Sequence, residues 1–164
     1  MIAVRRGFLT LSSGYTLIEI LATLTIVFLL AAIAVPFSQV SMQRSKEVEL
    51  RRALLEIRTA INVYKAASDD GKILKKMGDS GYPPNLDVLV SGVTNAKSPS
   101  GQPLYFLRRI PRDPFSERSV SGGKSWGLRS YNSPPEEPTE GVDVFDVFSR
   151  SAGRSLDGTL YREW

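Results

Sequence analysis

The side chains that could do chemistry in this chain are carboxylates, serines and lysines, because its 164 residues include no histidine and no cysteine. Histidine is the commonest general base near neutral pH, and cysteine supplies thiolate nucleophiles, metal ligands and disulfides. Carboxylates, serine or lysine alone still support some reactions. With both leading residue types absent, we expect a protein that is not an enzyme and has no catalytic residue.

One carboxylate stands apart because it lies inside a long apolar segment. Residues 15–37 are mostly apolar and carry a single charge, that of Glu19. The segment is long enough to cross a hydrocarbon core of roughly 30 Å at about 1.5 Å per residue. A carboxylate in such a segment costs about 2.5–3.5 kcal/mol on membrane insertion. We therefore expect Glu19 to have a function and a charged partner.

Three kinds of N-terminal signal fit this region. An ordinary secretory signal peptide would be cut after Ala34, which ends a run of small residues, and Arg5-Arg6 suits a twin-arginine export signal. The third possibility is a short leader, residues 1–14, cut after Gly14. We favour the leader because an export signal gains nothing from the carboxylate of Glu19. In this interpretation the basic residues before the segment stay in the cytoplasm and send the rest of the chain outward.

Six consecutive residues, Gly14-Tyr15-Thr16-Leu17-Ile18-Glu19, form a motif that resembles the cleavage site of type IV prepilins, which an apolar helix also follows. The resemblance implies that a prepilin peptidase cuts between Gly14 and Tyr15 and methylates the new amine of Tyr15. It also implies that Glu19 faces the N-terminal ammonium of a neighbouring subunit in a filament. Such pairing is physically reasonable, because opposite charges removed from water offset each other's desolvation.

A helical pattern continues over residues 38–70, beyond the expected transmembrane and filament-core helix of residues 15–37. Apolar residues recur there at steps of four and three, which marks one face of an amphipathic helix: Leu50, Leu54, Ile57, Ile61 and Tyr64. Pro36 removes one backbone hydrogen bond and predicts a kink. Asp69-Asp70-Gly71 is typical of a helix end.

Residues 71–164 are expected to form a globular head. Short segments broken by glycine and proline replace the helical pattern, and Asn85 is a candidate cap for a short helix. Aromatic and β-branched residues predict strands near 104–107, 126–131 and 142–148. We expect an α+β fold in which the second half of a long N-terminal helix packs against a small antiparallel sheet.

Motifs in the head narrow the resemblance, which then covers nearly the whole chain. In their order they are similar to the major pseudopilin of type II secretion systems: Tyr82-Pro83 with Leu86 and Leu89, Arg109–Pro114, Trp126-Gly127 and Asp143–Ser149. The absence of cysteine agrees, because many type IV pilins close a C-terminal loop with a disulfide.

The resemblance implies a subunit that polymerises into a helical homo-oligomer and drives folded proteins through the outer membrane. Its partners would be the prepilin peptidase, the minor pseudopilins and an inner-membrane assembly platform. It would cross the inner membrane once, with its head and the assembled filament in the periplasm. The alternative is a type IV pilin that serves adhesion, motility or DNA uptake.

The same resemblance implies a calcium site in the loop after Val147-Phe148-Ser149, built from acidic side chains and backbone carbonyls. This loop instead contains Arg150 and Arg154, with Asp157 as its acidic residue. Asp146 or Asp143 would have to complete a weak site. We expect Arg150 or Arg154 to pair with Asp157 in place of the ion, and we expect no cofactor.

The net charge of +4 does not indicate a nucleic-acid-binding protein. Acidic and basic residues alternate over most of the chain, whereas nucleic-acid binders gather basic residues on one face with interleaved aromatic residues. We therefore expect no nucleic acid among the partners.

Overall fold

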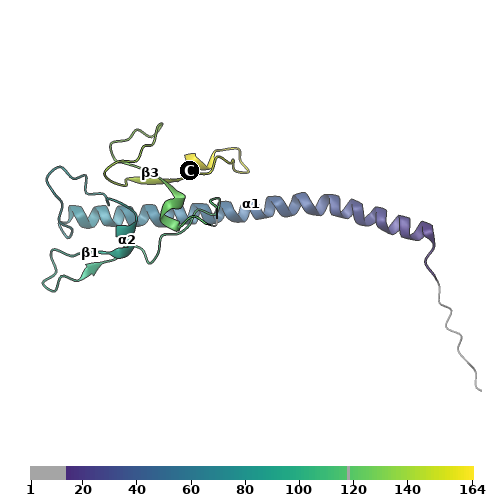
Figure 1. Cartoon of the computed structure of the whole chain (residues 1–164), viewed down its shortest axis with the longest axis horizontal. Coiled ribbons are helices and arrows are strands. Elements are labelled where there is room, and N and C mark those ends of the chain that lie inside the picture. Colours follow the sequence, from purple (N-terminus) through teal and green to yellow (C-terminus); the bar gives the residue numbers. More distant parts are fainter. Residues whose placement is uncertain (1–13, 118) are drawn as a thin grey trace, which may run out of the picture. The chain divides into compact units, whose positions relative to one another are not determined.

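The computed structural model describes residues 14–117 and 119–164, apart from the side chains of residues 35 and 36. The expected leader lies outside the described residues except for Gly14. The elements in chain order are helix α1 (Leu17–Asp69), helix α2 (Asp87–Ser91), strands β1 (Val93–Thr94) and β2 (Pro103–Leu104), 3-10 helix η1 (Gly122–Ser125), strands β3 (Trp126–Arg129) and β4 (Asp146–Ser149), and 3-10 helix η2 (Tyr161–Glu163) (Figure 1).

Helix α1 belongs to two compact units of the chain. The first unit extends to Val40 and the second comprises Ser41–Trp164. All the buried apolar side chains of the described residues belong to the second unit. The α+β layout expected from the sequence is confirmed, with one long N-terminal helix and short antiparallel strands.

The predicted apolar stripe of α1 forms one wall of the core in the second unit. Its five residues are between 0% and 6% exposed, and Ala53, Ala60 and Ala67 are buried beside them. The alanines recur every seven residues, which places them along the same face, where small side chains let neighbouring segments come close. The opposite wall consists of Ile73, Leu86, Leu89, Leu107, Trp126, Val144, Val147 and Tyr161.

The end of α1 matches the sequence prediction. The helix ends at Asp69, and Gly71 has a φ of 70°, a left-handed conformation that suits glycine. The amide of Lys72 donates to the carbonyl of Ala67 (2.9 Å) and that of Gly71 to the carbonyl of Ser68 (3.0 Å). These two bonds form a Schellman motif, which satisfies carbonyls at the helix end.

The strands are shorter than the sequence predicts and form two separate sheets. In the described residues β1 pairs only with β2 and β3 only with β4, both antiparallel, instead of forming one small sheet. The strand expected over 104–107 ends at Leu104, because the amides of Phe106 and Leu107 both donate to the carbonyl of Leu89 in the middle of α2.

The other two strand predictions were also wrong in their limits. The strand expected over 126–131 ends at Arg129, and that expected over 142–148 begins only at Asp146. The amide of Val144 donates to the carbonyl of Pro83 (2.8 Å), so this part of the chain pairs outside the β3–β4 ladder. Asn85 behaves as expected, since its side-chain oxygen accepts a hydrogen bond from Val88 (3.1 Å) at the start of α2.

The burial of α1 predicts that its two faces differ sharply in their tolerance of mutation. Ile57 is 0% exposed, so Ile57→Ala should lower the free energy of unfolding of residues 41–164 by about 2–5 kcal/mol. Leu55, on the same helix, is 68% exposed, and Leu55→Ala should stay within about 0.5 kcal/mol of the parent. Urea denaturation measures both changes, and equal losses would contradict the assigned core face.

Candidate functional site

The proposed cleavage site lies in a non-helical segment immediately before α1. Residues 14–16 have no regular structure, and Gly14 and Tyr15 are exposed. A side chain added at Gly14 would meet no atom within 4 Å, and Gly14 is not among the glycines with positive φ. Packing among the described residues therefore does not require glycine at position 14.

Glu19 occupies the first turn of α1 and is exposed. Its amide donates to the side-chain hydroxyl of Thr16 (3.3 Å), so Thr16 caps the helix. A carboxylate in the first turn also interacts favourably with the helix dipole. The spacing Thr-x-x-Glu is typical of a capping box, a local contribution that the sequence analysis did not consider.

The first part of α1 is apolar on every described face. It contains the one helix segment of the described residues that is long and apolar enough to cross a membrane, with a mean hydropathy of 2.6 and no buried residue. Leu17, Ile18 and Phe28 are each more than 70% exposed. An exposed apolar surface of this kind marks contact with lipid or with other proteins. The helix continues through position 36, and the kink expected at Pro36 stays a prediction.

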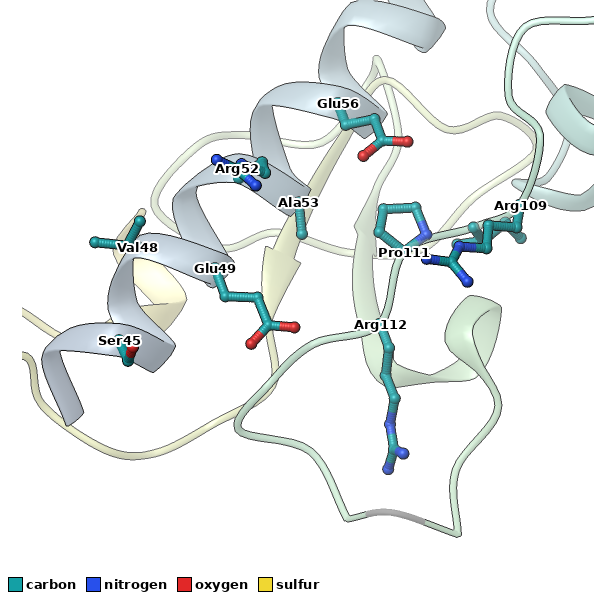
Figure 2. Close-up of a pocket in the computed structure, with 10 residues that line it drawn as sticks. Ser45, Val48, Glu49, Arg52, Ala53, Glu56, Arg109, Pro111 and Arg112 are labelled. Atoms are coloured by element: carbon teal, nitrogen blue, oxygen red, sulfur yellow. The ribbon is translucent and has the colours of Figure 1, made fainter. Parts of the chain in front are cut away.

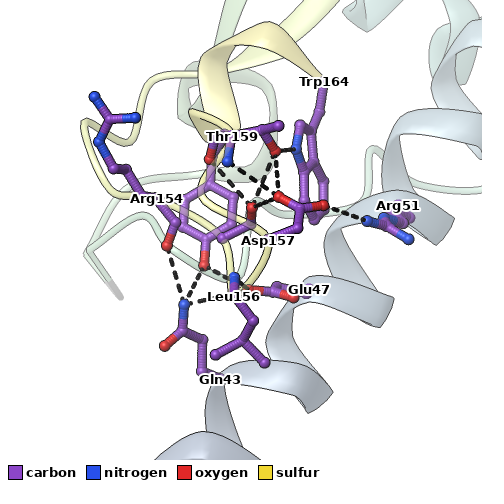
Figure 3. Close-up of polar contacts among 10 residues, drawn as sticks. Gln43, Glu47, Arg51, Arg154, Leu156, Asp157, Thr159 and Trp164 are labelled. Carbon is purple, nitrogen blue, oxygen red and sulfur yellow. Dashed lines mark hydrogen bonds and ion pairs between the residues drawn. The ribbon is translucent and has the colours of Figure 1, made fainter.

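The C-terminal segment is fixed to α1 by a buried carboxylate that the sequence analysis missed. Glu47 is 8% exposed, and its Oε1 accepts hydrogen bonds from the Leu156 amide (2.9 Å), the Tyr161 hydroxyl (3.0 Å) and Gln43 (3.2 Å) (Figure 3). Gln43 also donates to the carbonyl of Arg154 (3.0 Å). Two adjacent turns of α1 thus hold a loop more than 100 residues away in the sequence.

Asp157 caps its own loop and contacts α1. Its Oδ1 accepts hydrogen bonds from the Ser155 hydroxyl and from the amide (3.0 Å) and hydroxyl (2.7 Å) of Thr159. Hydrogen bonds from Ser155 and then Thr159 lower the pKa of Asp157 from 3.8 to about 2, with a smaller contribution from the charge of Arg51. The guanidinium of Arg51 lies 3.8 Å from Oδ2 (Figure 3).

The expected pairing of Asp157 with Arg150 or Arg154 is wrong. Arg150 pairs with Glu140 (2.7 Å), and Arg154 donates to the carbonyl of Gly158 (2.9 Å). The cation near Asp157 comes instead from α1, as Arg51, which also lies over the ring of Trp164. The arginines of the loop were expected as partners because they are close to Asp157 in the sequence. The fold instead brings Arg51, which is distant in the sequence, next to Asp157.

The other two acidic candidates are engaged elsewhere. Asp146 accepts a hydrogen bond from Arg58 (2.7 Å) and has Arg129 at 4.0 Å. Asp143 is 6% exposed and accepts hydrogen bonds from Ser130, Tyr131 and Ser80. Burial raises the pKa of Asp143, but the hydrogen bonds from Ser130, Ser80 and Tyr131 outweigh it and lower the pKa overall.

The geometry of the loop does not fit a calcium ion. Among the described residues no group of three or more acidic side chains gathers where it could hold a metal. Calcium requires six to eight oxygen ligands, but a guanidinium already binds the carbonyl of Gly158 and hydroxyls already bind Asp157 Oδ1. The weak site suggested for Asp157 and Asp146 therefore has no support in the side-chain arrangement.

The head motifs that carry the family resemblance form a structural cluster. The indole of Trp126 donates to the carbonyl of Pro111 (2.9 Å), and buried Asp113 accepts a hydrogen bond from the hydroxyl of Ser149 (2.5 Å). A side chain added at Gly127 would meet the ring of Phe148 at 2.3 Å, so glycine is required there. The contacts among these residues therefore account for the residue types at these positions.

One pattern of catalytic type escaped the sequence analysis. Gly123-Lys124-Ser125-Trp126-Gly127 fits the spacing Gly-x-Ser-x-Gly of a nucleophile elbow, and Ser121 with Lys124 fits Ser-x-x-Lys. An elbow joins a strand to a following helix, whereas here η1 precedes β3. The hydroxyl of Ser125 donates to the carbonyl of Gly122 (2.6 Å), and the residue is 2% exposed. Ser125 is therefore not presented to a substrate.

Calcium should have little effect on the stability of residues 41–164, because Arg154 already binds a carbonyl of this loop and no cluster of acidic side chains gathers among the described residues. A ligand at 100 times its Kd would add about 2.7 kcal/mol to the native state. At roughly 2–8 °C per kcal/mol, this corresponds to a rise of about 5–20 °C in Tm for a domain of this size. We expect the same Tm in chelator and in millimolar calcium. A rise of several degrees that Asp157→Ala abolishes would contradict this.

Acid should weaken the C-terminal loop in a defined range of pH. The pKa of Asp157 falls from 3.8 to about 2 on folding, so its contribution to stability is complete above pH 3.8 and is lost as the pH falls through about 2. Asp157→Asn keeps a side-chain oxygen acceptor and removes the titration, so its Tm should fall less between these two pH values. Parallel decreases in the two proteins would show that Asp157 does not control this transition.

Comparisons of the chain with protein-family models, with curated proteins and with solved structures gave no match.

Proposed function

We propose that this chain is a filament subunit of the type IV pilin-like class, and specifically a major pseudopilin of a type II secretion system. The observation that carries the proposal is the position of Gly14–Glu19. An exposed, non-helical Gly14-Tyr15 bond comes directly before a helix that is apolar on all its described faces and carries one carboxylate in its first turn.

Cleavage after Gly14 would give the helix two opposite charges at one end. The new ammonium of Tyr15 would lie four residues before the carboxylate of Glu19. Both charges are costly in an apolar environment, and each is stabilised when it pairs with an opposite charge of another subunit. The same helix then serves in two states, first as a single membrane anchor and later as the core of a filament.

The head is suited to a mechanical role at the outer end of this helix. Its core is continuous along the second half of α1, and the tail is bound to α1 through Glu47. These contacts attach both the core and the tail of the head to α1, which favours a mechanical role. In the proposed system, a prepilin peptidase processes the chain in the inner membrane, and an assembly platform with minor pseudopilins extends the filament in the periplasm.

Glu19→Ala tests the charge pairing inside the filament. The variant should still be cleaved and inserted, because loss of a charge makes the helix more apolar, but the filament fraction recovered from the periplasm should disappear. Glu19→Gln should fail equally, since the interaction needs a charge. Thr16→Ala is the matched control, because it removes the helix cap and keeps the carboxylate. Normal filaments from both Glu19 variants would refute the pairing.

Deletion of the gene separates secretion from pilus function. A major pseudopilin is needed for export through the outer membrane, so folded substrate proteins should accumulate in the periplasm. Twitching, adhesion and transformation should stay at the parental level. Measured losses in motility or DNA uptake with normal export would favour the type IV pilin alternative.

A further inference from the structure

The outer face of α1 forms an open groove with the segment that follows β2. Its apolar lining includes Leu55 and Val63 of α1 and Tyr105, which are 68%, 52% and 65% exposed. These are large apolar side chains, and the described residues of the second unit leave at least half of each exposed. A neighbouring groove on the same helix is lined by Val48, Glu49 and Arg112 among others (Figure 2).

The rim of the groove at Leu55, Val63 and Tyr105 is positively charged. Arg52, Arg108 and Arg109 line it, against one acidic residue, Glu56. None of the three arginines forms an ion pair with residues 14–117 or 119–164. An apolar, aromatic floor with a basic rim suits a segment that combines apolar rings with carboxylates.

One loop of the same chain has this chemistry. Residues 134–140, between β3 and β4, read Pro-Pro-Glu-Glu-Pro-Thr-Glu and are exposed throughout. Of its three glutamates only Glu140 forms an ion pair with a described residue, namely Arg150. Glu136 and Glu137 therefore present two charges next to three proline rings.

Hydrogen bonds close the base of this loop. The hydroxyl of Ser133 accepts a hydrogen bond from the Thr139 amide (2.8 Å) and donates one to the carbonyl of Glu137 (3.1 Å). The amide of Ser130 donates to the carbonyl of Thr139 (3.0 Å). A loop closed in this way loses less conformational entropy on binding than an open one.

The loop does not fill the groove of its own chain. Its residues Pro135, Glu136 and Pro138 border a different depression, next to Phe148 and Trp164. Within the second unit, β3 and the hairpin that contains β1 lie on opposite sides of α1 (Figure 1). Contact between groove and loop thus requires two copies, and it joins different faces of them. A contact of this heterologous kind extends into an open chain of subunits when its rotation does not close a ring.

We propose that the groove at Leu55, Val63 and Tyr105 receives the proline–glutamate loop, residues 133–141, of a second copy of this chain. The proline rings pack on Tyr105 and Leu55, and Glu136 and Glu137 meet Arg52 and Arg108. This inference rests on the proposed function, since it locates a lateral contact between heads within the filament.

Disulfide cross-linking in the full-length chain tests the contact, because the sequence contains no cysteine of its own. Thr59 lines the groove and Pro135 lies in the loop. Oxidation of cells that carry Thr59→Cys with Pro135→Cys should give a ladder of covalent multimers. Each single variant should give dimers at most. The matched control is Met77→Cys with Pro135→Cys, since Met77 is fully exposed and lies outside the groove, and it should give no ladder.

Charge reversal supplies the second arm in the same cysteine background. Glu136→Arg with Glu137→Arg should abolish the ladder, and the addition of Arg52→Glu with Arg108→Glu should restore it. Filaments recovered from the periplasm without a ladder would overturn the groove contact and leave the proposed function intact. A ladder in cells that form no filament would support the contact and count against the proposed function. Absence of both would overturn both.

Discussion

The rest of this structure depends on how apolar residues are distributed along α1. They cover every described face of its first part and only one face of its second part. Up to Val40 none of the described side chains of the helix is buried, so the helix exposes an apolar surface there. From Leu50 onward the apolar residues form a stripe, which shares one core with buried side chains of α2, β3, β4 and η2. One continuous backbone therefore carries an unpartnered surface and a complete core.

The stripe alone does not fix the C-terminal segment, which contributes only a few apolar groups. That role belongs to Glu47, whose carboxylate joins the Leu156 amide and the Tyr161 hydroxyl in a buried position. Hydrogen bonds to a charged acceptor are stronger than neutral ones, and a buried donor without a partner is costly. The loop is held by side chains from α1 and by the bond from Arg154 to the carbonyl of Gly158.

The parts of the structure that follow from local sequence were predictable. The spacing of Leu50, Ile57 and Tyr64 identified the core face, and the Asp-Asp-Gly sequence identified the end of α1. Local patterns did not predict strand limits or hydrogen-bond partners that depend on residues far apart in the sequence. The strands are short because the amide of Val144 bonds to Pro83 and that of Leu107 bonds to Leu89. In the sequence, Glu47 resembles an ordinary exposed charge on a helix, and only the folded tail brings its partners close to it. The expected partner of Asp157 was wrong for the same reason, because Arg51 is 106 residues away.

The central claim of this account is that the chain functions with its N-terminus at Tyr15. Intact-mass spectrometry of the protein extracted from membranes, followed by sequencing of its N-terminal peptide, tests that claim directly. The account predicts one species that begins at Tyr15 and carries one added methyl group on its amine. A chain that begins at Val35, as after removal of a secretory signal peptide, would contradict it, and so would a chain that still begins at Met1.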